Sequence, residues 1–136
     1  MEWKVCGCSS RVKGYKLKIL VTGASGFIGN HLIKELLKNT NHEIIATSRD
    51  MEKAKKYDWF SKVKYISYDL ENKEEQNLFS YFDNPDIVIH LAWDGLPNYN
   101  DLIHIEKNLF NNYRFIKNLI SNGLKDITIT GTCFEY

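Results

Sequence analysis

The chain has 136 residues, of which 43% are hydrophobic and 26% are charged, and its formal net charge is +1. This length suggests a single domain with a real core, and the near-neutral charge gives no electrostatic reason to expect a nucleic-acid or membrane-surface partner. No apolar run is long enough to span a bilayer, and the N-terminus lacks the apolar segment of a secretory signal, so a cytoplasmic protein is expected.

The first 16 residues fit neither the helical nor the strand period, and we expect them to form a disordered or upstream leader. Cys6 and Cys8 lie in this segment, and Cys133 is the third cysteine of the chain. Their spacing is not that of a disulfide framework. No second Cys or His pair follows at the spacing of a zinc finger, so no metal site is expected.

Alternating strands and helices are predicted from Leu17 onward. Five apolar segments bounded by turn residues are expected to be strands, over 17–23, 42–48, 63–69, 85–93 and 124–130. Helices are expected between them, over 27–39, 50–60, 72–82 and 100–121. The predicted apolar side of the last helix comprises Leu102, Ile105, Leu109, Tyr113, Ile116 and Ile120.

Strands that alternate with helices through short loops predict an α/β fold, with a parallel sheet covered by helices on both faces. Because strand–helix–strand crossovers are right-handed, a Rossmann-type, doubly wound sheet with the strand order 3-2-1-4-5 is favoured. His90 falls inside the apolar fourth strand and is expected to be a hydrogen-bonded core histidine.

Gly23, Gly26 and Gly29 follow the first strand with the spacing G-x-x-G-x-x-G. The first glycine allows a sharp turn, the second lets the backbone approach a pyrophosphate, and the third lets the helix pack closely on the sheet. The N–H groups of residues 26–29 and the helix dipole would face the phosphates. The alternative is a glycine-rich turn that binds no ligand. The residues of this predicted dinucleotide site are Gly23, Ser25, Gly26, Phe27, Ile28 and Gly29.

The end of the second strand bears on which dinucleotide binds. An acid there would hydrogen-bond the ribose hydroxyls of NAD, whereas this chain has Ser48 followed by Arg49. A guanidinium suits a 2′-phosphate, so NADP is favoured and NAD is the second choice. In the alternative, Arg49 is a solvated residue at the strand end and Asp50 binds the ribose. Asp50 is also a candidate N-cap of the following helix.

These motifs resemble the extended short-chain dehydrogenase/reductases, a family of NAD(P)-dependent sugar-nucleotide epimerases, dehydratases and ketoreductases. The glycine loop is followed by "YDL" (68–70) and "HLAW" (90–93), and then by Asn108 and "TGTCFEY" (130–136). The resemblance covers 17–136 and implies an NAD(P)-binding Rossmann domain that is truncated, with the substrate domain absent.

The resemblance also implies roles for single residues. Asp69 would contact the adenine amino group, with Leu70 beside the ring. Ala92 would pass close to the nicotinamide ribose. The remaining cofactor-binding residues would be Leu91, Trp93 and Asn108, although the tryptophan replaces the small residue usual in the family.

Thr132 matches the active-site serine or threonine of the family and is the predicted catalytic residue. Family dehydratases carry an Asp-Glu pair where Cys133 and Phe134 stand, so the resemblance favours a reductase or epimerase that transfers hydride at C4 of a nucleotide-linked sugar. The family's catalytic Tyr-x-x-x-Lys pair follows the fifth strand, and the chain stops before it. Tyr113 and Lys117 have the same spacing but lie on the preceding crossover helix, where we expect a core tyrosine and a solvated lysine.

The chain alone is accordingly expected to turn over no substrate and to bind dinucleotide weakly or not at all. The alternative, from a different class of protein, is a non-catalytic dinucleotide-sensing or interaction module. The fifth strand would be left as the edge of the sheet, which favours self-association, either as a homo-oligomer or through that edge.

Overall fold

The computed structural model of the protein describes residues 15–73 and 76–131. The predicted leader up to residue 14, all three cysteines and the tail from Thr132 to Tyr136 therefore lie outside the described residues.

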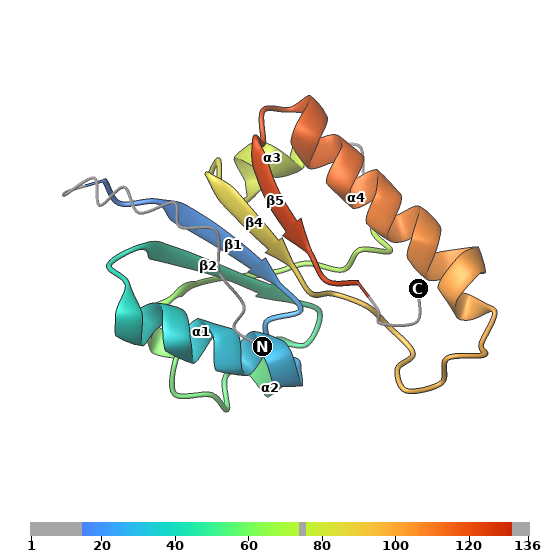
Figure 1. Ribbon diagram of the computed structural model, residues 1–136, viewed down its shortest axis with the longest axis horizontal. Coiled ribbons are helices and arrows are strands. Elements are labelled where there is room, and N and C mark those ends of the chain that lie inside the picture. The colour runs from blue at the N-terminus through green and yellow to red at the C-terminus, as the bar shows by residue number, and fades with distance from the viewer. Residues whose placement is uncertain (1–14, 74–75, 132–136) are drawn as a thin grey trace, which may run out of the picture.

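One parallel sheet of five strands forms the centre of the protein (Figure 1), in the order β3-β2-β1-β4-β5. In the register of the central strands, Leu20 lies beside Ile45 on one side and Val88 on the other. This arrangement confirms the predicted doubly wound α/β fold and its strand order. The strands are β1 (Lys18–Thr22), β2 (Glu43–Ser48), β3 (Lys64–Ser67), β4 (Ile87–His90) and β5 (Asp126–Ile129).

Helices cover both faces of the sheet (Figure 1). On one face lie α1 (Phe27–Asn39), α2 (Met51–Ala54) and the 3-10 turn η1 (Phe60–Lys62). On the other face lie α3 (Leu78–Tyr81) and α4 (Phe110–Ser121). Within the described part of the chain, no helix is long and apolar enough to cross a membrane.

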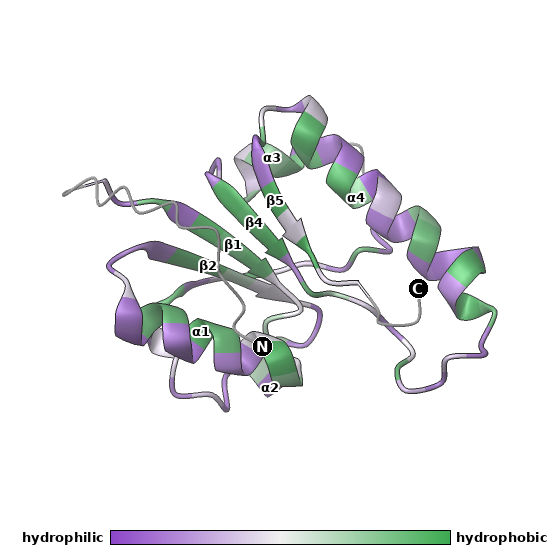
Figure 2. Ribbon diagram, viewed as in Figure 1, coloured by the Kyte–Doolittle hydropathy of each residue, from purple (hydrophilic) through white to green (hydrophobic). Residues whose placement is uncertain are grey.

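Two hydrophobic clusters, one on each face of the sheet, hold the helices in place. Val21 packs with Ile33 of α1 on the first face, and Val88 packs with Phe115 of α4 on the second. Hydrophobic residues run along the central strands β1 and β4 (Figure 2), as expected for strands covered on both faces. Each fully buried aliphatic side chain of this kind contributes about 1.5–3 kcal/mol to the free energy of unfolding.

The helix predicted over 27–39 is confirmed as α1, but the helix predicted over 50–60 is wrong beyond its first turn. Asp50 caps α2 as predicted, since its Oδ1 accepts a hydrogen bond from the N–H of Lys53 at 2.9 Å. The following aromatic residues then leave the helix to pack beneath α1. Tyr57 and Trp59 stack with ring centroids 5.4 Å apart, and tertiary packing overrides local helix propensity.

Of the helix predicted over 72–82, the described residues form only the single turn α3, while residues 74–75 lie outside the description. Asn77 caps it by accepting a hydrogen bond from the N–H of Ser80 at 3.1 Å. Asn118 of α4 accepts a second one from the N–H of Leu78 at 2.9 Å. The start of α3 is therefore set by two side-chain amides, one of them 40 residues away, which hydrophobic periodicity does not reveal.

The helix predicted over 100–121 begins later, as a π-helical segment η2 (His104–Leu109) that continues into α4. Its predicted apolar side is wrong, and so is the prediction that Tyr113 is a core residue. The stripe that faces the sheet carries two asparagines, because polar groups at the end of β4 need partners there. The exposed residues of the predicted apolar side are Leu102, Ile105, Leu109, Tyr113 and Ile120. The buried residues are Asn108, Asn112, Phe115 and Leu119.

Candidate functional site

A cavity of about 390 Å³ opens at the carboxyl ends of the strands. Gly23 lines it after β1, Arg49 after β2, Asp69 after β3 and Asp94 after β4, while η2 contributes Asn108. In open parallel sheets, ligands bind at this edge, where neighbouring crossovers lead to opposite faces. The volume is within the range of small-molecule sites, about 300–1,000 Å³.

The glycine loop at this cavity has no room for side chains. Gly23 has a φ of +67°, and a Cβ there would lie 3.0 Å from the backbone of Leu91 and Ala92. A Cβ at Gly29 would lie 2.3 Å from the carbonyl oxygen of Gly23, which is closer than atoms can approach. The turn and the close packing of α1 on β1 therefore both require glycine.

The start of α1 is open to an anionic group. Gly26 is the N-cap residue and offers no side-chain hydrogen bond, and the first turn of α1 contains no acidic residue. The first N–H groups of the helix consequently have no intrahelical acceptor and carry the positive end of its dipole. A pyrophosphate fits both the shape and the charge of this position.

Two hydrogen bonds from neighbouring segments fix the backbone of the glycine loop. The hydroxyl of Tyr57 donates to the carbonyl oxygen of Ser25 at 3.2 Å, and the N–H of Ala24 donates to the carbonyl oxygen of Thr47 at 3.1 Å. Thr47 also lines the cavity, and its buried Oγ1 has no hydrogen-bond partner among residues 15–73 and 76–131. Because buried hydroxyls are almost always paired, this oxygen marks a place for a ligand or a water.

His90, at the end of β4, is 3% exposed and is hydrogen-bonded through both ring nitrogens, which confirms its prediction as a core histidine. The side-chain Nδ2 of Asn112 donates to the carbonyl oxygen of Asn108 at 2.7 Å, so its Oδ1 accepts from Nε2 of His90 at 2.5 Å. The other ring nitrogen, Nδ1, accepts from the hydroxyl of Thr22 at 2.9 Å. Burial lowers the pKa of His90 and keeps the ring neutral.

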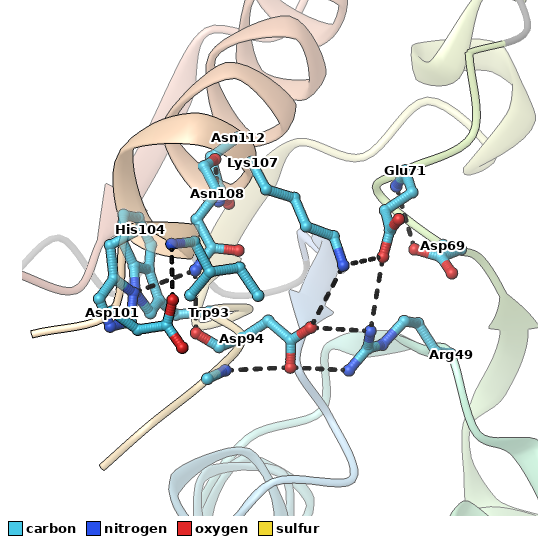
Figure 3. A network of polar contacts seen from close by, with 12 residues as sticks. Arg49, Asp69, Glu71, Trp93, Asp94, Asp101, His104, Lys107, Asn108 and Asn112 are labelled. Carbon is cyan, nitrogen blue, oxygen red and sulfur yellow. Dashed lines mark hydrogen bonds and ion pairs between the residues drawn. The ribbon is translucent and has the colours of Figure 1, made fainter. Parts of the chain in front are cut away.

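Asn108 extends this network to the loop after β4. Its Nδ2 donates to the carbonyl oxygen of Asp94 at 2.9 Å and lies 3.2 Å from Nδ1 of His104. The indole N–H of Trp93 donates to the same Nδ1 at 3.0 Å, so the ring proton of His104 is on Nε2, which donates to the carbonyl oxygen of Asn98 at 2.7 Å. The backbone that carries Trp93 and Asp94 is thereby tied to η2 (Figure 3).

Four charged side chains, three from the loops after β2, β3 and β4 and one from η2, meet at the mouth of the cavity (Figure 3). Arg49 donates two hydrogen bonds to Asp94, at 3.1 and 3.0 Å. Lys107 pairs with Glu71 at 2.5 Å and lies 3.8 Å from Asp94, and Arg49 lies 3.9 Å from Glu71. The hydrogen bonds from Arg49 hold the pKa of Asp94 below its ordinary range, so this carboxylate is ionised at neutral pH.

The hydroxyl of Ser48 is turned toward a tyrosine. Tyr65 donates its hydroxyl proton to the carbonyl oxygen of Ser48 at 3.0 Å, so the Ser48 hydroxyl, 2.7 Å from the Tyr65 oxygen, donates in return. Burial raises the pKa of Tyr65. Ser48 therefore presents an acceptor oxygen to the cavity, because its proton is already used.

All of the fourteen predicted cofactor-binding residues except Phe27, Ile28 and Gly29 line this one cavity. Phe27 and Ile28 are 81% and 60% exposed on the first turn of α1, and Gly29 is buried against the loop. Thr132, the predicted catalytic residue, lies outside the described residues.

Tyr113 and Lys117 do not line the cavity. Tyr113 is 58% exposed on α4, and the Nζ of Lys117 lies 5.6 Å from its ring centroid. Within the described ranges, no group of three or more His, Cys, Asp or Glu side chains is placed to hold a metal ion.

Several residues of the site were not predicted. Tyr57, Asp94 and Lys107 act through partners more than 30 residues away in the chain, so no local spacing identifies them. A weak signal existed for Asp94, because it directly follows "HLAW" in the loop after β4. Asn112 carried no sequence signal beyond its spacing of four residues from Asn108.

The chain is similar in sequence to a known protein family and to curated proteins. A model of the NAD dependent epimerase/dehydratase family matches residues 19–136. The dTDP-6-deoxy-L-talose 4-dehydrogenase (NAD(+)) of Aggregatibacter actinomycetemcomitans is 30% identical, over 88% of this chain and 43% of that protein. The dTDP-4-dehydro-6-deoxyglucose reductase of Escherichia coli is 31% identical, over 80% of this chain and 36% of that protein. The chain thus spans less than half the length of these curated relatives.

Solved structures of sugar-nucleotide epimerases are also similar to this chain. The UDP-glucuronic acid 4-epimerase from Bacillus cereus, in complex with NAD, matches with a TM-score of 0.66 at 25% identity, over 86% of this chain and 40% of that one. The UDP-N-acetylglucosamine 4-epimerase from the same species matches with a TM-score of 0.67 at 20% identity, over 89% of this chain and 42% of that one, which shows a shared fold.

Proposed function

This chain belongs to the NAD dependent epimerase/dehydratase family, and from that premise we propose that it is the dinucleotide-binding part of a sugar-nucleotide reductase or epimerase. The cavity at the carboxyl ends of the strands would bind NADP(H), with NAD(H) as the second choice. When bound, the dinucleotide supplies or accepts the hydride exchanged at C4 of the sugar.

The observation that carries this proposal is the glycine loop. A Cβ at Gly29 would overlap the backbone of Gly23, and the first turn of α1 has neither a side-chain cap nor an acidic residue. A glycine-rich turn that binds no ligand would require the glycines but not an uncapped helix start. The open helix start beside a cavity is the additional feature that a phosphate-bearing ligand requires.

The ends of the strands suggest how the dinucleotide would lie. Asp69 and Leu70 follow β3 and would receive the adenine, while Arg49 follows β2 and would face the 2′ position of the ribose. Ala92 and Asn108 lie on the β4 side of the glycine loop and would receive the nicotinamide end. The hydrogen bonds of Asn108 to the loop after β4 would position that end of the site.

For the reaction, Thr132 would donate a hydrogen bond to the oxygen at C4 of the sugar, as its resemblance to the family's active-site hydroxyl implies. The acid–base Tyr-x-x-x-Lys pair of the family follows the fifth strand and is not among these 136 residues at that position. We therefore expect the chain by itself to release no product. Because described residues of this chain line the whole cavity, we expect it to bind the dinucleotide, although weakly.

The test is a titration of the purified chain with NADPH and NADH, followed by tryptophan fluorescence up to millimolar ligand. NADPH is expected to bind more tightly than NADH, and Arg49→Ala is expected to remove the difference. A preference for NADPH that survives Arg49→Ala would contradict the assignment of Arg49 to the 2′-phosphate. The absence of binding by either dinucleotide would contradict the proposed function itself.

A second candidate is a dinucleotide-sensing module without catalysis. The natural protein that contains this chain should be mixed with NADPH and a nucleotide-linked 4-keto sugar. Loss of NADPH absorbance supports the enzyme, whereas dinucleotide binding without oxidation supports the module.

A further inference from the structure

The ion pair between Arg49 and Asp94 spans the cofactor groove. Arg49 directly follows β2, Asp94 lies in the loop after β4, and β1 runs between these two strands in the sheet. Neighbouring strands are about 4.8 Å apart, so the two backbones stand roughly 10 Å apart across the end of β1. Both side chains line the same cavity as Thr22 and Gly23, where β1 ends and the glycine loop begins.

The pair has the geometry of a specific contact. Two nitrogens of the Arg49 guanidinium donate to the two carboxylate oxygens of Asp94, at 3.1 and 3.0 Å. One of these oxygens also accepts from the N–H of Gly95 at 3.0 Å, which fixes the carboxylate. The Arg49 side chain is still 52% exposed, so a ligand can reach it from solvent.

A phosphate would compete for the same donors. Carboxylates and phosphates both bind the guanidinium fork in a bidentate manner. Arg49 is the residue at the end of β2, the position at which this type of fold recognises the ribose 2′ substituent. Asp94 and Glu71 also place negative charge at the mouth of the cavity, which repels a phosphate until the network opens.

On the basis of the proposed function, we propose that Asp94 is a specificity-determining residue. It holds Arg49 across the groove and competes with the 2′-phosphate of NADP(H). NAD(H) has no 2′-phosphate and leaves the pair intact, whereas NADP(H) must exchange the carboxylate of Asp94 for its own phosphate. Asp94 therefore reduces the discrimination that Arg49 would otherwise give, and the chain accepts both dinucleotides more evenly.

The test compares dissociation constants for NADPH and NADH in the wild-type chain, Asp94→Asn, Arg49→Ala and the double variant, at one fixed ionic strength. Asparagine keeps the oxygen that accepts from the N–H of Gly95. An exposed bidentate pair corresponds to about a two- to fivefold change in an equilibrium constant. Asp94→Asn is therefore expected to raise the preference for NADPH over NADH by about two- to fivefold.

The double variant and a charge control separate competition from a general charge effect. In the Arg49→Ala background, Asp94→Asn should raise the NADPH-to-NADH ratio by less than it does in the wild-type chain, because only the loss of charge repulsion remains. Asp126→Asn removes the same charge at the opposite, amino-terminal end of β5 and should leave the ratio at the wild-type value. Circular dichroism verifies folding, and Asp94→Ala is the second variant, for which the same rise in preference is expected.

Two results would overturn the proposal. One is an NADPH-to-NADH ratio that does not change in Asp94→Asn and Asp94→Ala, and the other is an equal rise in the Arg49→Ala background. If the dinucleotides bind and the ratio behaves in either of these ways, the role of Asp94 is wrong while the proposed function stands. If neither dinucleotide binds to any variant, both are overturned.

Discussion

Nε2 of His90 lies 2.5 Å from Oδ1 of Asn112, so the end of β4 and the buried side of α4 are joined by a hydrogen bond inside the core. Nε2 of His90 is the donor and Oδ1 of Asn112 is the acceptor, because the Nδ2 of Asn112 donates to the carbonyl oxygen of Asn108. This contact positions α4 and η2, and with them Asn108 at the cavity.

The buried His90 makes stability depend on pH. Its pKa is lowered by burial, whereas in the unfolded chain it has the ordinary value of about 6.5. As the pH falls, His90 is therefore protonated in the unfolded chain before it is protonated in the folded one. Its contribution to the free energy of unfolding is complete above a pH of about 6.5 and is lost as the pH falls toward the lower pKa of the folded state. Urea unfolding followed by the fluorescence of buried Trp59 should show this loss, and His90→Gln should reduce it. An unchanged pH dependence in His90→Gln would rule out this role.

Removal of the Asn112 side chain should leave the proton of His90 without an acceptor. An unsatisfied buried donor costs about 1–3 kcal/mol, so Asn112→Ala is expected to lower the free energy of unfolding by this amount. Asn111→Ala is the matched control, because Asn111 is partly exposed and its side chain accepts a hydrogen bond from the exposed Arg114. Equal losses in the two variants, measured by urea unfolding, would contradict the importance of this hydrogen bond.

Substitutions of Gly29 and Gly26 should affect stability and dinucleotide binding to different degrees. Gly29→Ala places a Cβ 2.3 Å from the carbonyl oxygen of Gly23 and is expected to cost about 1–3 kcal/mol of stability through overpacking. Gly26→Ala meets that oxygen at 3.1 Å and should cost less stability, but it places a methyl group where a phosphate would approach. Thermal unfolding and NADPH titration of both variants test this, and equal thermal destabilisation would be inconsistent with the geometry.

The hydroxyl of Tyr57 supports the loop from α2's side of the sheet. Tyr57→Phe removes the hydrogen bond to the carbonyl oxygen of Ser25 and should cost about 1 kcal/mol of stability, together with a weaker affinity for NADPH. Tyr113→Phe removes a hydroxyl from the exposed face of α4 and should change neither quantity. A loss of NADPH affinity in Tyr113→Phe would show that Tyr113 has a role at the dinucleotide site.

Self-association of the chain is expected from two exposed features. Among the described residues β5 is an edge strand of the sheet, and the continuous helix of η2 and α4 exposes an apolar side that includes Leu109 of η2. Light scattering should show assemblies that grow with concentration, and Leu109→Glu should reduce them more than Arg114→Glu, which introduces an acid at an exposed polar position of α4. A monodisperse monomer at all concentrations would contradict this expectation.

The fold could be predicted because it depends on local signals. The apolar strands, the glycine loop and the right-handed crossovers determine the order β3-β2-β1-β4-β5, and most predicted binding residues lie at strand ends, which the same signals locate. The orientation of the continuous helix of η2 and α4 could not be predicted, because its buried stripe contains Asn108 and Asn112 and its exposed side is apolar. Hydrophobic periodicity assigns such a helix to the wrong side.

Contacts between distant residues account for the other failures. The pair of Arg49 and Asp94 joins loops 45 residues apart, and Tyr57 reaches Ser25 across 32 residues. Charge logic at the end of β2 pointed to Arg49 as the residue for a 2′-phosphate, and Arg49 lines the cavity, but the sequence could not show that this cation already has a partner.

Binding of a dinucleotide in this groove is tested most directly by a titration of the ¹⁵N-labelled chain with NADPH, followed by amide chemical shifts, which detect weak binding. We expect the largest changes at the glycine loop around Gly26, at Arg49 and at Asp69, with little change at Asp126 on the opposite end of the sheet. Amides of the glycine loop that do not shift at several equivalents of NADPH, or changes confined to surfaces away from the cavity, would contradict the claim that this groove binds a dinucleotide.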